Sequence, residues 1–354
     1  MFKNEVSEFI YKRTYSRWLE EEGRREDWPE TIERLIGFLI SKNPDIPEKT
    51  ISKIRKYMMK FAVMPSMRML WAAGPAATAD NTAIYNCSFA KINSVEAFAE
   101  CLYILMCGTG FGFSVESEEV NKLPKVPEIK SGQGLARIII EDSKKGWADS
   151  VKTLMDSLYK GQNLYFDYSA IRPEGARLMT MGGRASGPQP LVKLHDFIRE
   201  TMHNAQGRKL TTLEAHDICN QIAEIVVVGG VRRSSQISLS DLDDEEMRHA
   251  KVWPFPIKRA MANNSAIFRE KPTAADFLIE WGALAKSGTG ERGIFNLESA
   301  QKKAPARRYA PLIQGTNPCG EIMLRDMEFC NLSEVVVRED DDLDSLLDKV
   351  ETAT

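Results

Sequence analysis

The sequence has little of what builds a metal site or a disulfide-stapled fold. It contains only six cysteines and four histidines among 354 residues. No two cysteines stand in the CxxC spacing of structural zinc sites, and the histidines form no pair at ligand spacing. Six cysteines also make no disulfide framework for a chain of this length, so we predict no metal site and a reducing, cytoplasmic setting.

An excess of one charge and long apolar runs are also missing. The net charge is −3, and no basic patch is interleaved with aromatic residues, so we expect no nucleic-acid partner. No apolar run approaches the roughly 18 to 20 residues that span a bilayer, and residues 1–8 are too mixed and charged for a signal peptide, so we expect no membrane partner. With 43% hydrophobic residues, the chain can bury the core of one large or two ordinary domains.

The densest chemistry lies in residues 315–332, which read GTNPCGEIMLRDMEFCNL. Pro318 fixes its own φ angle, and Gly320 permits backbone geometry that a side chain would forbid. This pattern predicts a tight turn with Cys319 at the tip of a loop. The apolar residues 331–337 predict a buried strand, which would place Cys330 beside a rigid wall.

An isolated free cysteine is usually a small buried hydrophobe, and this is the first interpretation of any thiol here. Cys319 differs because it stands beside Asn317, a hydrogen-bonding amide, and Glu321, which can exchange a proton. The remaining cysteines lie in apolar or helical surroundings and are interpreted as packing residues: Cys101, Cys107 and Cys219.

The NPCGE turn followed by a second cysteine resembles the finger loop of ribonucleotide reductase catalytic subunits. The opening YKRTYSRWL, IRPEGA and ASGP stretches look most like the adenosylcobalamin-dependent class II enzymes, although the diiron-dependent class I large subunits share the core. Six further segments resemble, in order, segments of the same family and span nearly the whole chain: YKRTYSRWLEEEGR, YNCSFAKI, GTGFGFSVE, SAIRPEGARLMTMGGRASGPQPL, GGVRRSSQISLSDLDDEEM and NNSAIF.

The resemblance implies reduction of ribonucleotides to 2′-deoxyribonucleotides. Cys319 would become a transient thiyl radical that abstracts the 3′ hydrogen of the substrate, and Glu321 would handle the proton of the 3′ hydroxyl. Asn317 would hold the ribose hydroxyls. Cys87 and Cys330 would supply the reducing equivalents and become a disulfide, which a thioredoxin- or glutaredoxin-type reductant re-reduces by exchange. Such a pair needs Cα atoms within roughly 7 Å of each other.

The resemblance also implies substrate and effector contacts. Ser66 would lie near the substrate phosphate, and Asn86 and Gly110 would be substrate neighbours, although a GxGxG run alone is weak evidence for nucleotide contact and Ser66 also suits a simple turn. The stretches 171–187 and 229–234 resemble the two loops that couple a bound dNTP or ATP effector to substrate choice. Their arginines, which can pair with phosphate and stack on bases, are the candidates here: Arg172, Arg232 and Arg233.

Residues 142–161 predict an amphipathic helix. In relatives such helices pair between protomers, and the stretch 117–168 is shorter here than in the monomeric class II enzyme, which favours a homodimer. The alternative is that the apolar face packs on its own domain. That face carries Trp147, Val151, Leu154, Met155 and Leu158.

Alternating strands and helices indicate an α/β fold. We predict a helical region over 1–64, then strands over 163–168, 234–239 and 292–297 among helices over 97–107, 191–205, 212–227 and 274–287. The resemblance implies that residues 65–354 form the first half of a ten-stranded α/β barrel with a central finger loop at about 312–330. The barrel is incomplete in this chain, so a C-terminal half of the reductase is an expected partner.

Two other functions stay open. The chain could be a non-catalytic nucleotide-effector-binding or assembly module derived from a reductase, or a simple dithiol oxidoreductase that uses Cys87 and Cys330. The second fits poorly without a CxxC motif. The sequence also leaves open whether the substrate is a ribonucleoside diphosphate or triphosphate, and whether the radical comes from adenosylcobalamin or from a metal-containing small subunit.

Overall fold

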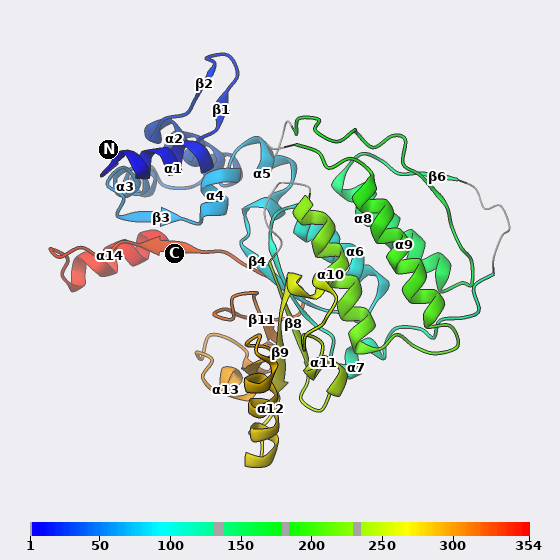
Figure 1. Ribbon diagram of the computed structural model, residues 1–354. Helices are drawn as coiled ribbons and strands as arrows, with labels where there is room; N and C mark the ends of the chain where they lie inside the picture. The colour runs from blue at the N-terminus through cyan, green and yellow to red at the C-terminus, as the bar shows by residue number, and fades with distance from the viewer. Residues whose placement is uncertain (1, 131–136, 179–183, 229–234) are drawn as a thin grey trace. The chain divides into compact units, whose positions relative to one another are not determined.

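The structure is a computed structural model that describes all residues except 1, 131–136, 179–183 and 229–234 (Figure 1). It contains two compact units: residues 1–86 together with 331–354, and residues 87–330. The units are groups of residues that pack mainly against each other, and their boundaries differ from those of the predicted domains, 1–64 and 65–354. The domain boundaries stay a prediction. Among the described residues, no helix is both long and apolar enough to cross a bilayer.

The first unit is mainly helical, as the sequence predicts for residues 1–64. Helix α2 begins with a capping box at Asp27 and buries Ile32, Leu35 and Ile36 at helical spacing, whereas Trp18 lies in a short strand and is exposed. The elements are α1 (Glu5–Thr14), β1 (Trp18–Leu19), β2 (Arg24–Arg25), α2 (Trp28–Lys42), α3 (Glu48–Met59), β3 (Val63–Pro65), α4 (Met67–Ala72), α5 (Pro75–Ala79), η1 (Asn81–Ile84), β14 (Ser333–Val335) and α14 (Leu343–Ala353).

The prediction of a buried strand over residues 331–337 is wrong, because these residues are not buried. Only β14 is a strand there, paired antiparallel with β3, and Leu332 and Val337 on either side of it are exposed. β14 belongs to a two-stranded ribbon rather than to a larger sheet, and α14 is the helix that packs on it, so an apolar run is not enough to bury it.

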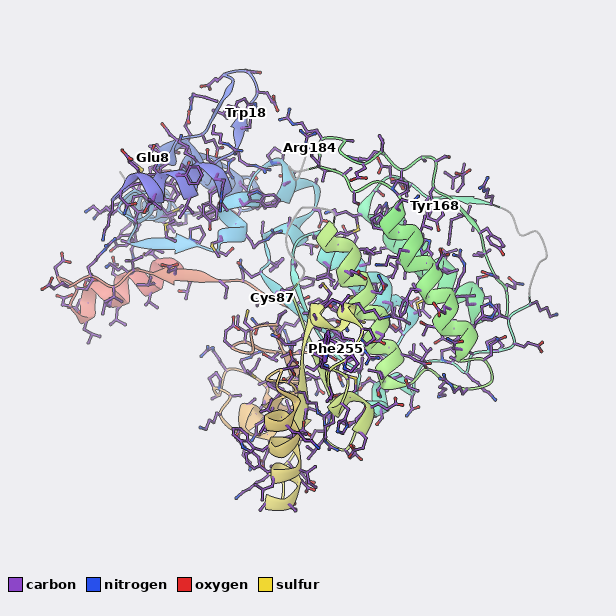
Figure 2. The ribbon with its side chains drawn as sticks, viewed as in Figure 1. Glu8, Trp18, Cys87, Tyr168, Arg184 and Phe255 are labelled. Atoms are coloured by element: carbon purple, nitrogen blue, oxygen red, sulfur yellow. The ribbon has the colours of Figure 1, made fainter. Side chains whose placement is uncertain are left out.

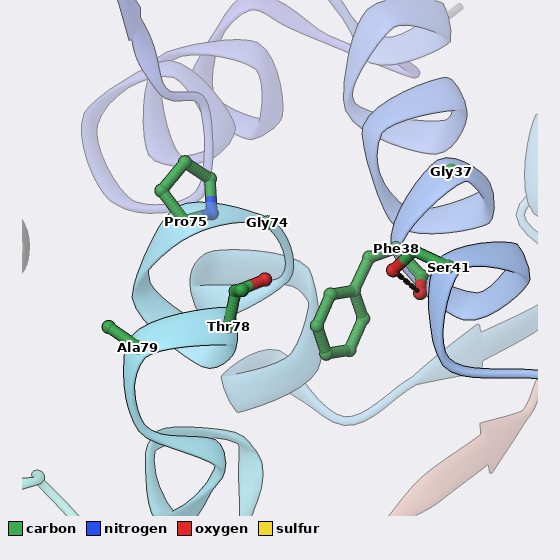
Figure 3. Close-up of a pocket in the computed structure, with 7 residues that line it drawn as sticks. All are labelled: Gly37, Phe38, Ser41, Gly74, Pro75, Thr78 and Ala79. Carbon is green, nitrogen blue, oxygen red and sulfur yellow. Dashed lines mark hydrogen bonds between the residues drawn. The ribbon is translucent and has the colours of Figure 1, made fainter.

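The first unit also contains a shallow apolar groove of about 640 Å³ between α2 and α5 (Figure 3). None of the predicted site residues is among those that line it. Its lining consists of Gly37, Phe38, Ser41, Gly74, Pro75, Thr78 and Ala79.

The second unit is built on a six-stranded sheet with the order β10-β9-β8-β5-β4-β13. The first five strands in this order are mutually parallel, and β13 joins antiparallel at the β4 edge. The sheet strands are β4 (Cys87–Lys91), β5 (Gly110–Ser114), β8 (Gln236–Asp241), β9 (Ala262–Phe268), β10 (Gly293–Asn296) and β13 (Glu328–Cys330).

Helices cover one face of this sheet in two layers, visible in Figure 1. Helices α6 and α10 lie on the sheet, and α8 and α9 pack on them. These four helices are α6 (Val95–Met106), α8 (Lys144–Leu158), α9 (Gln189–Asn204) and α10 (Thr212–Val228). The remaining elements of the unit are α7 (Ser117–Val120), β6 (Ile138–Ile139), β7 (Phe166–Asp167), α11 (Glu245–Arg248), η2 (Ile257–Met261), α12 (Ala274–Ser287), α13 (Leu297–Lys302), η3 (Ala310–Leu312), β11 (Gly315–Thr316) and β12 (Met323–Leu324).

Most predicted elements of this unit are confirmed, and one is not. The five predicted helices correspond to α6, α8, α9, α10 and α12, and two predicted strands to β8 and β10. The strand predicted over 163–168 is wrong as part of the main sheet, because β7 pairs only with β6 in a separate ribbon. The α/β class and a mostly parallel sheet are therefore established.

A buried ion network anchors α12 to the sheet. The Glu280 carboxylate accepts hydrogen bonds from Arg292 at 2.7 and 2.9 Å and from Arg248 at 3.0 Å. Arg292 also donates to the Ser240 hydroxyl and to the backbone carbonyls of Asp241, the last residue of β8, and of Leu242. Because all three side chains are buried, their charges stabilise the fold only as a complete set.

Candidate active site

Two buried thiols face each other across neighbouring strands. Cys87 begins β4, Cys330 ends β13, and the two residues are direct partners in the antiparallel register. Directly opposed residues in such a pair have Cα atoms roughly 4.5 to 5.5 Å apart and side chains on one face, which lies within the range for a disulfide. No disulfide joins them in this structure. The close approach expected of positions 87 and 330 is met. Figure 2 labels Cys87.

The environment keeps the Cys330 thiol protonated. Its hydrogen bond with Cys87, its burial and the negative charge of Glu321 all raise the pKa of Cys330 far above the ordinary value for a thiol. The Glu321 side chain itself is exposed.

The predicted tight turn is a closed hairpin. Strands β11 and β12 pair antiparallel, and the turn between them is held by Asn317, whose N–H donates to the Ile322 carbonyl at 3.1 Å. The Asn317 Oδ1 accepts from the Ile322 N–H at 3.0 Å, and Gly320 adopts a φ of +85°. Cys319 is exposed at the tip of this turn, as predicted.

Three glycines, which have no side chain, allow the hairpin to lie directly against the sheet. A Cβ on Gly112 would lie 2.2 Å from the Thr316 carbonyl oxygen, and one on Gly315 would lie 2.2 Å from the Phe89 ring. A Cβ on Gly110 would lie 3.1 Å from both Cys87 Sγ and the Pro318 ring. Two sheet glycines therefore admit the hairpin and bring the residue before Cys319 against the thiol pair.

The contact between the hairpin and the sheet explains the GTGFGF sequence better than nucleotide contact does. Along β5, Phe111 and Phe113 enter the core beneath the helices, while Gly110 and Gly112 face the hairpin. The role of Gly110 as a substrate neighbour stays a prediction. Three residues of this contact are not among the predicted site residues: Gly112, Gly315 and Phe89. The alternation of glycine and phenylalanine along β5 is the signal that could have identified Gly112.

Asn317 offers an unused hydrogen-bond donor. The side chain is buried, its Oδ1 is taken by the turn, and its Nδ2 has no hydrogen-bond partner among the described residues. A buried donor without a partner costs about 1 to 3 kcal/mol, so the amide suits a ligand oxygen. One strand pair and one turn thus bring together an exposed thiol, a dithiol, an amide and a carboxylate.

Two family models match the chain: the ribonucleotide reductase alpha domain over residues 1–75, and the insertion domain of B12-dependent ribonucleotide reductase over residues 125–202. The adenosylcobalamin-dependent ribonucleoside-triphosphate reductase of Lactobacillus helveticus is 30% identical over 419 residues, covering 94% of this chain and 54% of the relative. That of Lactobacillus gasseri is 29% identical, with the same two coverages.

A solved structure agrees with these relatives. The crystal structure of a B12-dependent (class II) ribonucleotide reductase superposes on 98% of this chain with a TM-score of 0.80 and 26% identity, and the match covers 56% of that chain. The present chain is a homologue of the class II, adenosylcobalamin-dependent ribonucleotide reductases. It spans about half the length of the curated relatives that it matches and corresponds to an N-terminal portion of them.

The insertion-domain match includes α8, the helix expected to pair between protomers of this reductase homologue. Its apolar face is buried within its own unit, where α8 packs on α6 and α9. This arrangement favours the alternative that the face packs on its own domain, and a homodimer stays a prediction.

The remaining predicted site residues of the reductase homologue have local partners or lie outside the described part. Arg172 Nε donates to Asp142 Oδ2 at 2.6 Å, and Arg232 and Arg233 fall outside the described residues. Ser66 caps α4 by accepting from the Met69 N–H at 3.0 Å. Their effector and substrate roles stay predictions.

Asn86 directly precedes Cys87, and its buried Oδ1 has no hydrogen-bond partner among the described residues. An unsatisfied acceptor at this place suits the predicted substrate contact. The three cysteines interpreted as packing residues are fully buried: Cys101, Cys107 and Cys219.

Proposed function

We propose that this chain reduces ribonucleotides to 2′-deoxyribonucleotides by thiyl-radical chemistry, as the N-terminal part of a ribonucleotide reductase that a C-terminal half completes. The observation that carries the proposal is the register pairing of Cys87 with Cys330 beside the turn that exposes Cys319. The likeness to class II reductases over 98% of the chain supports it.

The proposed reaction assigns each group one task. A thiyl radical at Cys319 takes the hydrogen atom from the ribose 3′ carbon, and the hydrogen returns there at the end of the turnover. Glu321 accepts the proton of the 3′ hydroxyl, and Asn317 Nδ2 donates to a ribose oxygen. Cys87 and Cys330 together give two electrons and two protons, so the 2′ hydroxyl leaves as water and a disulfide remains.

The raised pKa of Cys330 fits this task. A thiol that stays protonated can deliver hydrogen as well as electrons, whereas a thiolate is a nucleophile and a metal ligand. Because the pair is buried, a thioredoxin- or glutaredoxin-type dithiol needs a relay or an opening to restore it by exchange. We propose such a reductant as a partner.

Adenosylcobalamin, when bound, supplies radical chemistry. Among the six cysteines, only Cys319 is exposed, so its thiol fits a group that an external radical source must reach. Cys319 is the residue that we assign to receive the radical, and a metal-containing small subunit is the alternative source. A ribonucleoside di- or triphosphate is the proposed substrate, with dNTP or ATP effectors.

The edges and the second face of the six-stranded sheet support the proposal that a C-terminal half completes the fold. β10 and β13 are its edge strands, and the face opposite the helices is covered in part by the finger hairpin. Edge strands of a buried, mostly parallel sheet are normally paired or covered. We propose that the C-terminal half adds strands here and closes a ten-stranded barrel around the finger loop.

The test is to co-express the chain with a C-terminal half of a class II reductase and to measure deoxynucleotide formation with adenosylcobalamin and a dithiol. We expect turnover that Cys319→Ser abolishes, while the matched control Cys107→Ser retains it, because Cys107 lies outside the cluster. Comparing diphosphate and triphosphate substrates in the same assay decides between them.

A well-folded complex without turnover would refute the catalytic proposal. If dNTPs then raise its melting temperature, and still do so in the Cys319→Ala variant, the chain is instead a nucleotide-effector-binding or assembly module.

A further inference from the structure

Helix α12 has the composition of a buried helix but is exposed. Its sequence, AADFLIEWGALAKS, is apolar on nearly all sides, and a helix of this kind is normally buried. Yet Leu278 is 64% exposed, Ile279 56% and Trp281 53%, and Phe277 stacks on Trp281 at the surface. Figure 1 shows α12 projecting from the second unit, away from α8 and α9.

The attachment of α12 is polar, which is the reverse of an ordinary amphipathic helix. Glu280 is the only residue of α12 that is fully buried, and Arg292 and Arg248 hold it by ion pairs. Charged groups therefore fix the helix on its inner side, and the large apolar side chains are left outward. A contiguous apolar surface of this kind marks an interaction site.

The position of α12 indicates what covers it. The helix connects β9 to β10, and β10 is the end strand of the sheet. The chain superposes over nearly its full length on just over half of a class II reductase, so the rest of that relative lies outside the match. A polypeptide that extends the sheet from β10 would lie next to α12.

We propose that the apolar surface formed by Phe277, Leu278, Ile279 and Trp281 is the docking surface for the C-terminal half of the reductase. This inference rests on the proposed function, because it names the place where the completing polypeptide binds. The aromatic pair supplies the anchor that such interfaces favour, since a few large apolar side chains carry most of the binding energy.

The experiment compares two exposed aliphatic residues on helices, Leu278 in α12 and Val6 in α1, which is 66% exposed. Each is changed to lysine in the full chain, and the affinity for the C-terminal half is measured by titration. We expect Leu278→Lys to weaken binding about tenfold or more, as loss of a central apolar contact does. Val6→Lys is expected to change affinity by about twofold or less, and both variants should keep the wild-type melting temperature.

Hydrogen exchange on the unmodified chain gives a second readout that needs no variant. Amides of α12 should become protected when the C-terminal half binds. If the complex forms deoxynucleotides while α12 exchange and the affinity of Leu278→Lys stay unchanged, this inference is wrong and the proposed function stands. If the chain alone sediments as a dimer that Leu278→Lys dissociates, the occupant is a second copy and the inference is also wrong. If no complex forms, both proposals fail.

Discussion

Replacing Gly112 with alanine should unseat the finger hairpin. The added Cβ would lie 2.2 Å from the Thr316 carbonyl oxygen, whereas carbon–oxygen contacts normally begin at about 3.3 Å. The hairpin must therefore retreat by about 1 Å. A second close contact joins the same two parts, because Gly315 of the hairpin lies against the ring of Phe89 in β4, and a retreat would loosen this contact as well. Overpacking of this kind costs about 1 to 3 kcal/mol of unfolding free energy.

Urea unfolding measures this loss, and Gly37→Ala is the control. Gly37 lies within α2, and a Cβ added there would have no other heavy atom within 4 Å. Alanine at this position should therefore stabilise the protein by about 0.5 to 1 kcal/mol. The two glycines should thus shift stability in opposite directions although the chemical change is identical.

A second assay reports on the contact between the hairpin and the sheet. Pro318 of the hairpin lies beside Cys87, so a retreating hairpin should raise the rate at which a small alkylating reagent labels Cys87, measured by mass spectrometry. A Gly112→Ala protein with unchanged stability and unchanged labelling would refute the idea that these glycines seat the finger loop.

Three further outcomes follow from buried groups. Glu280→Gln should lower the unfolding free energy by about 3 to 5 kcal/mol in urea titrations, because it leaves the buried Arg292 without its carboxylate partner and removes one of the two carboxylates that pair with Arg248; an effect below about 1 kcal/mol would contradict this. Burial lowers the pKa of His195 and of His216 to about 3, so the unfolded chain takes up protons first as pH falls below 6.5. Stability is full above pH 6.5 and should fall by about 1.4 kcal/mol per pH unit for each histidine until about pH 3, and unfolding titrations at pH 7, 6 and 5 check the slope. Mild oxidation should join Cys87 to Cys330, seen as one cross-linked peptide that Cys330→Ser removes; failure to form it would show that the register partners do not meet.

The sequence predicted the long helices and the finger turn well, because each depends on local pattern. The period of apolar residues defines α9, α10 and α12 within a few residues, and the Pro318–Gly320 pair defines the turn. The partnership of Cys87 with Cys330 came from the resemblance, since residues so far apart in sequence carry no local signal of their contact.

The errors arise where burial depends on distant segments. Residues 163–168 and 331–337 have strand-like patterns, but which sheet a strand joins is decided by tertiary packing, and β7 and β14 each found a single partner. β4 and β5 were missed as strands because small and glycine residues weaken the usual signal, although they form the centre of the site.

The glycine-rich strand β5 has a consequence for how the protein opens. Glycine makes a strand intrinsically loose, but β5 is hydrogen-bonded on both sides, to β4 and to β8, and its phenylalanines are locked in the main core. The rigidity of β5 therefore comes from its neighbours in the sheet and the core, and not from the conformational preferences of its own residues. Under heat or denaturant, β5 should be among the last segments to exchange its amide hydrogens. The geometry of the site should therefore be lost together with the global fold and not before it.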